Sequence, residues 1–290
     1  GLFSLPGASK AGRIEIVDIG IPHGTDSAHK TSLITSDWIN KTIPTRSHSS
    51  HKGTFGKVLV VAGSEKYIGA AYLACSAAMR CGAGLVTLAC PKSIYPIMAS
   101  KLSEVTYLPM PESNGMFSAK MVPLMLDAIT NYDALLIGPG MGLGPSIENI
   151  LHDTILSSSF PSIPTILDAD GLNNIRNIRN WETSLHAPTA ITPHMAEMSR
   201  LLNIPLSQVE SDRFKVTKAS AIRWNISVLL KGPYTLISDS NGNTLVNPFA
   251  NANLASAGTG DVLSGIIAGL AAHDMPIFEA AACGAYIHGA

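Results

Sequence analysis

The sequence predicts an α/β fold with a mostly parallel central sheet. From Lys57 onward, short β-branched runs alternate with longer Ala-rich or amphipathic stretches, a pattern typical of βαβ units. Most of the short runs are apolar throughout, as expected when helices cover both faces of a sheet. With 290 residues, 46% of them hydrophobic and 14% charged, the chain is long and apolar enough for a substantial core.

The first 50 residues differ from the rest. A strand-like run, Arg13 to Ile19, is followed by a polar stretch rich in Ser, Thr and His that reaches His51. We predict an N-terminal arm or linker over residues 1–50 and the main domain over residues 51–290. Because the arm lacks core periodicity, we expect its removal, residues 1–45, to leave activity nearly unchanged.

Six runs in the main domain are predicted to be strands: Val58–Ala62, Leu85–Ala89, Ala134–Gly138, Thr165–Asp168, Thr189–Thr192 and Ile226–Lys231. A turn-rich stretch, residues 239–243, separates two further runs, Tyr234–Ser238 and Thr244–Asn247, which predicts an antiparallel hairpin at the edge of the sheet. The expected helices are Ala70–Arg80, Ser118–Thr130, Ser207–Asn225 and Asp261–Ala272. Ser207 with Glu210 three residues later resembles a capping box.

Composition excludes several classes of function. The formal charge of −1 provides no basic stripe, so we expect no nucleic-acid partner. No apolar run reaches the ~18 residues of a membrane span and no signal pattern opens the chain, so we expect a cytoplasmic protein without a membrane partner. The four cysteines, Cys75, Cys81, Cys90 and Cys283, form no CxxC pair and are expected to be reduced core thiols.

The strongest candidate site is the stretch Ala257–Asp261, which opens an apolar helix. Its small residues, Gly258, Thr259 and Gly260, would let unpaired N–H groups of the first turn converge on an anion such as a phosphate. Asp261 sits at the same helix start and could serve as a carboxylate base. From spacing alone, Asp261 could equally be an ordinary N-cap.

Other candidates follow predicted strands. The glycines of residues 138–144 match neither a P-loop nor a dinucleotide fingerprint, and they could form a pocket wall or simply turn the chain. Lys231, followed by a Gly turn, could hold a nucleotide phosphate, although a lone Lys before a hairpin is more often solvated.

Two pairs of ionisable residues also follow predicted strands. His194 and Glu197 share a helix face, but without a second copy of this pair we expect a ligand-facing His rather than a metal site. Asp168 and Asp170 could organise water or Mg²⁺ near phosphates, or cap the next turn.

Taken together, these motifs resemble the ADP-dependent NAD(P)H-hydrate dehydratase family of the ribokinase-like superfamily. The resemblance covers residues 50–290 and rests on HKGTFGKVLVVAGS, GAAYLACSAAMRCGAGLVTLA, GPGMGLG, LDADGLN, TPHMAEM, LLKGPYT and NLASAGTGDVLSGIIAGL in this order. It implies a three-layer α/β/α sandwich. The family often has Pro-Gly-Glu where this chain reads Met195-Ala196-Glu197, which leaves the shape of that loop open.

The resemblance also implies a reaction, the dehydration of (6S)-NADHX or NADPHX to NADH or NADPH while ADP becomes AMP and phosphate. ADP or ATP would donate the phosphate, and Mg²⁺ would bridge nucleotide oxygens. Asp261 would take the proton of the 6-hydroxyl. By this resemblance, the hydrate would contact Ala70, Gly140, His194 and Asp261, and the nucleotide would contact Lys231, Gly232, Pro233, Tyr234, Thr235, Gly258, Thr259 and Gly260.

Residues 1–22 resemble the tail of the hydrate epimerase domain that often precedes this dehydratase. Because the chain starts without Met and stops in the apolar stretch of residues 280–290, we expect a fragment of a longer, fused protein. We also expect a homo-oligomer, with a tetramer as the expected form. Two alternatives stay open on sequence alone. A small-molecule kinase of the same superfamily would use the same GTGD loop, and a non-catalytic module would bind nucleotide without turnover.

Overall fold

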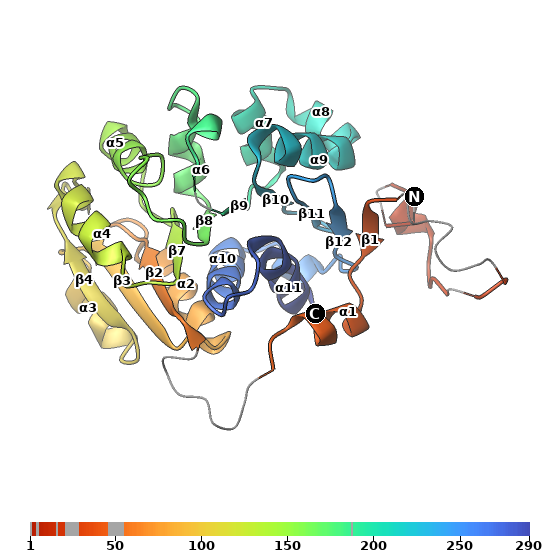
Figure 1. Cartoon of the computed structure of the whole chain (residues 1–290), viewed down its shortest axis with the longest axis horizontal. Helices are drawn as coiled ribbons and strands as arrows, with labels where there is room; N and C mark the ends of the chain where they lie inside the picture. The colour runs from red at the N-terminus through yellow and green to blue at the C-terminus, as the bar shows by residue number, and fades with distance from the viewer. Residues whose placement is uncertain (1, 4–5, 16, 21–28, 46–54, 187) are drawn as a thin grey trace.

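A ten-stranded sheet forms the centre of the molecule (Figure 1). The structure, a computed structural model, describes residues 2–3, 6–15, 17–20, 29–45, 55–186 and 188–290. The strand order is β1-β12-β11-β10-β9-β8-β7-β2-β3-β4. Seven neighbouring strands run parallel to one another, and they are β10 (Ser227–Leu230), β9 (Thr189–Ile191), β8 (Thr165–Leu167), β7 (Ala134–Ile137), β2 (Lys57–Val61), β3 (Leu85–Pro91) and β4 (Thr106–Met110).

Helices cover both faces of this sheet, which confirms the predicted fold class. Along β2, Val58 and Val60 belong to one apolar core, whereas Leu59 and Val61 belong to the other. The first core is closed by α1 (Ser36–Thr42), α2 (Ile68–Arg80), α3 (Tyr95–Lys101), α10 (Thr259–Ala271) and α11 (Ile277–Gly289). The second is closed by α4 (Val122–Ile129), α5 (Pro145–Asp153), α6 (Asp170–Ile175), α7 (Met195–Leu202), α8 (Leu206–Ser211) and α9 (Arg213–Trp224).

Short elements complete the described part of the chain. They are a two-stranded ribbon of β5 (Glu112–Ser113) and β6 (Met116–Phe117), and the 3₁₀ turns Gly7–Lys10, Ala119–Met121, Trp181–Thr183 and Ala252–Leu254. All six predicted strands of the main domain form within a residue or two of their expected ends. The sequence prediction missed β4, which contains Pro109 and lies at one edge of the sheet, where a missing N–H is tolerated.

The predicted antiparallel hairpin forms, but it does not lie at the edge of the sheet as predicted. β11 (Leu236–Ser238) pairs antiparallel with both β10 and β12 (Thr244–Val246). Beyond β12 lies β1 (Thr31–Leu33), which pairs with it in parallel. The edge strand therefore comes from the segment that was expected to be an irregular arm.

The prediction of an irregular arm is wrong for residues 31–42. Ile34 is 1% exposed and Ile39 is 7% exposed, and both belong to the first core, with α1 packed against α11. The strand predicted over residues 13–19 does not form among the described residues of that run. A strand is stable where a neighbouring strand offers backbone partners, and β12 offers them to residues 31–33. Removing residues 1–45 would uncover β12 and part of the core.

Two helix predictions also need correction. The stretch 207–225 forms two helices, because Asp212 ends α8 and its carboxylate accepts a hydrogen bond from the backbone N–H of Lys215 in α9. The capping box predicted at Ser207 does not form, since α8 begins after Pro205 without a side-chain cap. Cys75, Cys90 and Cys283 are buried, as predicted, whereas Cys81 is only partly buried. Within the described residues, no helix is both long and apolar enough to span a bilayer.

Candidate active site

The predicted site residues meet where the parallel strands end. Asp168 follows β8, His194 follows β9 and Lys231 follows β10, and a bridge links the backbones of His194 and Lys231. In open α/β sheets this edge is the usual ligand side, because the carboxyl ends of parallel strands and the starts of the following helices converge there. The first turn of α10 reaches the same place, since a Cβ built on Gly260 would lie 3.3 Å from Lys231 Nζ.

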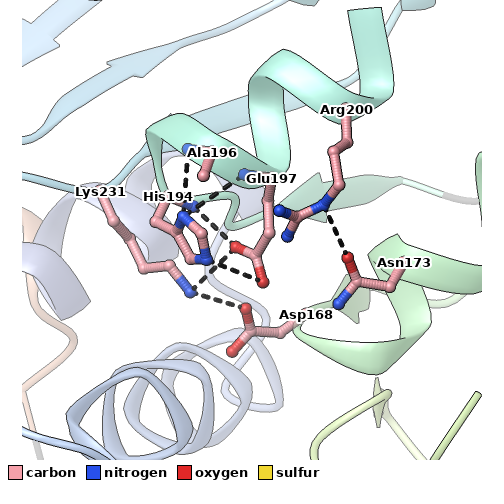
Figure 2. A network of polar contacts seen from close by, with 7 residues as sticks. All are labelled: Asp168, Asn173, His194, Ala196, Glu197, Arg200 and Lys231. Carbon is pink, nitrogen blue, oxygen red and sulfur yellow. Dashed lines mark hydrogen bonds and ion pairs between the residues drawn. The ribbon is translucent and has the colours of Figure 1, made fainter. Parts of the chain in front are cut away.

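Lys231 is the hub of this site (Figure 2). Its Nζ donates a hydrogen bond to Asp168 Oδ1 at 2.9 Å and lies 3.8 Å from Glu197 Oε2, and only 18% of its side chain is exposed. Burial alone would lower the pKa of Lys231, but the charges of Asp168 and Glu197 outweigh it and raise the pKa. Lys231 is therefore a buried, permanent cation and not a solvated surface lysine.

Asp168 is the hydrogen-bonded partner of this ammonium group. It is 1% exposed, and its second oxygen, Oδ2, has no hydrogen-bond partner within the described part of the chain. The next residue, Ala169, has φ 50° and ψ −118°, a conformation that a residue with a side chain rarely adopts. This turn separates two carboxylates, with Asp168 toward Lys231 and Asp170 toward the glycine loop, where it accepts a hydrogen bond from Gly142 N at 2.9 Å. Neither carboxylate caps α6.

His194 caps α7. Its Nδ1 accepts hydrogen bonds from Ala196 N at 3.1 Å and Glu197 N at 3.3 Å, and Glu197 Oε2 accepts one from His194 N at 2.8 Å, which completes a capping box. Burial, with the charges of Lys231 and Arg200, lowers the pKa of His194, so the ring is neutral, as an Nδ1 acceptor must be. The Met195-Ala196 departure from the family pattern therefore leaves a well-formed helix start.

Asp261 does not cap α10. The helix begins after Gly258, which has φ 89° and provides no side-chain cap, so Asp261 is the third residue of the helix. Within the described residues its carboxylate makes no hydrogen bond or ion pair. Burial and the nearby charge of Asp168 raise the pKa of Asp261 to about 6, against the lowering effect of Lys231. The N-cap alternative is therefore wrong, and among the described residues the carboxylate has no partner.

The glycine loop of residues 138–144 is held rigidly beside this site. Ser64 Oγ donates to Gly140 O at 2.7 Å, and Asn174 bonds Gly142 O at 2.9 Å and Gly144 N at 3.0 Å. Gly140 has φ 64°, and a Cβ there would lie 2.9 Å from Ala70 Cβ. Only glycine therefore allows the loop to meet the start of α2.

Ala70 and Gly140 thus lie together, as predicted for residues of one subsite. The start of α10 packs on the same helix, since a Cβ at Gly258 would lie 2.5 Å from Leu73 Cδ1. Leu73 is one turn after Ala70 and on the same helix face, which places the Ala70 subsite near Asp261.

A cavity of about 320 Å³, which we call the α10 cavity, opens beside Lys231. Six of the eight predicted nucleotide residues line it, namely Lys231, Gly232, Pro233, Thr235, Thr259 and Gly260. Tyr234 and Gly258 do not. The ring of Tyr234 packs edge-on against Phe3, and Gly258 is turned toward α2. A second cavity of about 500 Å³, the α7 cavity, is lined by His194, Lys231 and Gly260 among others, so the two cavities meet at Lys231.

Sequence reasoning missed part of the α10 cavity. Asn247, Phe249 and His288 line it, and they come from the end of β12, the loop after it and the last turn of α11. No local motif marks these residues, because the loop and α11 reach the site only through the packing of α11 against α10.

Comparisons with known proteins agree with this geometry. A family model described as NAD(P)H-hydrate dehydratase matches residues 58–290. A bifunctional NAD(P)H-hydrate repair enzyme from Moorella thermoacetica is 39% identical over 293 residues, which is 100% of this chain and 55% of that protein. An ADP-dependent (S)-NAD(P)H-hydrate dehydratase from Neisseria meningitidis is 35% identical, and the match covers 84% of this chain and 79% of the relative.

Solved structures show the same fold. An ADP/ATP-dependent NAD(P)H-hydrate dehydratase from Bacillus subtilis, co-crystallised with ATP/Mg²⁺, has a TM-score of 0.75 at 31% identity over 89% of this chain and 87% of that one. A ribokinase-like superfamily protein from Enterococcus faecalis has a TM-score of 0.77 at 25% identity over 90% and 86% of the two chains. This chain spans about half the length of the bifunctional relatives that it matches. By its sequence and by its ribokinase-like fold, the chain belongs to the NAD(P)H-hydrate dehydratase family.

Proposed function

We propose that this chain dehydrates (6S)-NADHX and NADPHX to NADH and NADPH, and that ADP is converted to AMP and phosphate in the same cycle. One observation carries the proposal. Asp261 stands with no hydrogen-bond partner among the described residues in the first turn of α10, next to Gly260, which packs against the buried ammonium of Lys231. A free base and a fixed cation at an uncapped helix start are the parts that phosphate transfer from a nucleotide to a hydroxyl requires.

Asp261 would act as the base. With a pKa raised to about 6, its carboxylate is still mainly ionised at neutral pH, yet it is a stronger base than an ordinary Asp and could accept the proton of the 6-hydroxyl. The 6-hydroxyl oxygen then forms a bond to the terminal phosphorus of ADP, and the bond from that phosphorus to the AMP oxygen breaks. Phosphate next leaves carbon 6 with the electrons of the C–O bond, the neighbouring carbon releases a proton to solvent, and the electrons of that C–H bond restore the ring double bond.

Lys231 and the first turn of α10 would stabilise the phosphate in transit. The ammonium is held by Asp168 at 2.9 Å, so it needs no reorganisation when negative charge develops beside it. The N–H groups at the start of α10 lack a side-chain cap and add the helix dipole to the same point. The α10 cavity leads away from this point and would take the rest of the nucleotide.

The residues present do not fit a metal site of their own. Among the described residues no group of three or more His, Cys, Asp or Glu side chains could hold a metal ion. The Mg²⁺ that we predict would therefore be held mainly by the oxygens of the nucleotide, where it neutralises phosphate charge.

A spectroscopic assay tests the proposal. The purified chain is mixed with (6S)-NADHX and ADP, and the absorbance of reduced nicotinamide is followed together with released phosphate. We expect both products in equal amounts, and none from the 6R epimer, which serves as the matched control substrate. A stable phosphoester without reduced nicotinamide would instead identify a kinase, and nucleotide binding without any product would identify a binding module.

We further predict how the whole protein is organised. An epimerase domain fused before this chain is suggested by the bifunctional relatives and by the resemblance of residues 1–22. We also predict a homo-oligomeric state and a cytoplasmic location. Size-exclusion chromatography with light scattering of the whole protein would decide its oligomeric state.

A further inference from the structure

The guanidinium of Arg213 is largely buried and has no anionic partner. Arg213 is the first residue of α9, and its Nε and Nη2 are buried without a hydrogen-bond partner in the described part of the chain. Burial lowers the pKa of Arg213, and no neighbouring charge among the described residues counters it, although a guanidinium stays charged. A buried unpaired charge is costly, and a cation at the start of a helix opposes the helix dipole. Stability therefore does not explain why Arg213 lies here.

Arg213 contacts the turn that follows β10. Its Nη1 donates a hydrogen bond to Pro233 O at 2.6 Å, across 20 positions of the chain. Its Nη2 lies beside Gly232, where a Cβ would come within 3.1 Å of it, and Gly232 has φ 150°, a backbone conformation that favours glycine. The guanidinium thus lies against the backbone of two consecutive residues of this turn.

Pro233 depends on this bond more than its neighbour does. The carbonyl of Gly232 is held from within the turn, since Thr235 Oγ1 donates to Gly232 O at 2.9 Å. Proline has no N–H, so its carbonyl is the one backbone group of Pro233 that a hydrogen bond can hold. Among the described residues, Arg213 supplies that bond.

The same turn forms part of the wall of both cavities. Lys231, Gly232 and Pro233 line the α10 cavity, and Lys231 and Gly232 also line the α7 cavity. Arg213 itself lines neither cavity, so it acts on a ligand through the backbone of the turn. A displacement of about 1 Å in groups that position a ligand is enough to weaken their contacts with it markedly.

We propose that Arg213 is a positioning residue that holds the turn of Gly232 and Pro233 in the shape that binds the nucleotide. This inference rests on the proposed function, which places ADP in the α10 cavity. Without the guanidinium, the carbonyl of Pro233 has no partner among the described residues and the wall of the cavity loosens. The affinity for ADP then falls although no group that lines the cavity has been removed. None of the four predicted hydrate contacts lies in this turn, so the KM for NADHX should not change.

Calorimetry of ADP binding, combined with steady-state kinetics, tests the proposal. Arg213→Met removes the donor and the charge at similar side-chain length. We expect the Kd of ADP to rise about three- to tenfold, the value of one net hydrogen bond, while kcat at saturating ADP and the KM for NADHX change less than about twofold. Arg213→Lys keeps a charged donor and should recover part of the lost affinity. A purely structural role would instead lower the melting temperature and leave the Kd unchanged.

Arg223→Met is the matched control. Arg223 belongs to the same helix, but its side chain is 67% exposed and lies 3.5 Å from Glu182, so its loss should leave the Kd of ADP at the wild-type value.

An unchanged Kd of ADP in Arg213→Met overturns the inference, and so does an equal rise in the Kd of ADP and the KM for NADHX. If Arg213→Met does not fold, Arg213→Gln, which also removes the buried charge, is measured in its place and the same results decide. Absence of ADP binding to the wild-type chain would contradict the proposed function itself. ADP binding that Arg213→Met does not weaken contradicts only the role of Arg213.

Discussion

Two helices, α7 and α10, begin at the same edge of the sheet, and their first turns are built in opposite ways. In α7, two first-turn N–H groups are used by His194 Nδ1, and Glu197 closes the box from the other side. In α10, Gly258 stands in the capping position, and within the described part of the chain no side chain caps the free N–H groups. The α7 start is saturated by its own side chains, whereas the α10 start is open.

The difference separates a helix start that is capped by its own side chains from one that we propose binds a phosphate. An uncapped first turn leaves donors and dipole for an anion from outside, at the cost of the stability that a cap would add. Lys231 lies between the two starts, 3.8 Å from Glu197 Oε2 and packed against Gly260. We therefore expect substitutions on the α10 side to affect catalysis and those on the α7 side to affect stability first.

The largest effect is expected from Asp261→Asn. Since Gly258 occupies the cap position, the substitution changes the base and not the helix start. Loss of a general base lowers kcat on the order of 10²- to 10⁴-fold. The melting temperature and the affinity for ADP should change little. Retention of most of the NADHX turnover would contradict the role of Asp261, and steady-state kinetics with a thermal melt measures both quantities.

Lys231→Ala tests the group that the two helix starts share. A hydrogen bond to a charged group contributes about 1.5–3 kcal/mol, so the KM for nucleotide should rise roughly 10- to 100-fold. We expect kcat to fall less, because the ammonium contacts phosphate in both the bound and the transition state. Lys215→Ala, which removes one exposed positive charge from α9, is the control for net charge. A loss confined to kcat would place Lys231 on the phosphate in transit alone.

The pH dependence of kcat/KM tests the charges around Asp261. Asp261 is active as a carboxylate, so kcat/KM should fall as pH drops below about 6, the raised pKa of Asp261. The charge of Asp168 helps to raise that pKa, so Asp168→Asn should move the acidic limb to lower pH. Lys231 lowers the same pKa, so Lys231→Ala should move the limb to higher pH. An acidic limb that stays in place in both variants would assign it to another group.

The smallest effect is expected at the saturated helix start. His194→Ala removes the cap of α7 and should lower the free energy of unfolding by about 0.5–2 kcal/mol. His194→Asn keeps a capping side chain and should restore most of that loss. Chemical denaturation of the two variants measures the difference. Equal loss in both would mean that His194 stabilises the chain by packing and not as a cap.

Local sequence pattern predicted the positions of several site residues. The GTGD turn, the lysine after β10 and the histidine after β9 were found from the sequence, because each sits at a strand end or a helix start that local pattern predicts. The sequence pattern did not determine the role of each residue within the site. Asp168 was a candidate for water or Mg²⁺, but it bonds Lys231, a residue 63 positions away. The choice between cap and base at Asp261 also needed the observed start of α10 at Gly258.

The sequence by itself determined the α/β class, the six core strands and the position of the glycine-containing turn that opens α10. These follow from periodicity, strand composition and turn residues, which act over a few positions of the chain. The tertiary structure alone decided that residues 31–33 complete the sheet and that Lys231 is buried between two carboxylates. Pairing, burial and charge at these points depend on segments far apart in the chain, and only the folded packing brings those segments together.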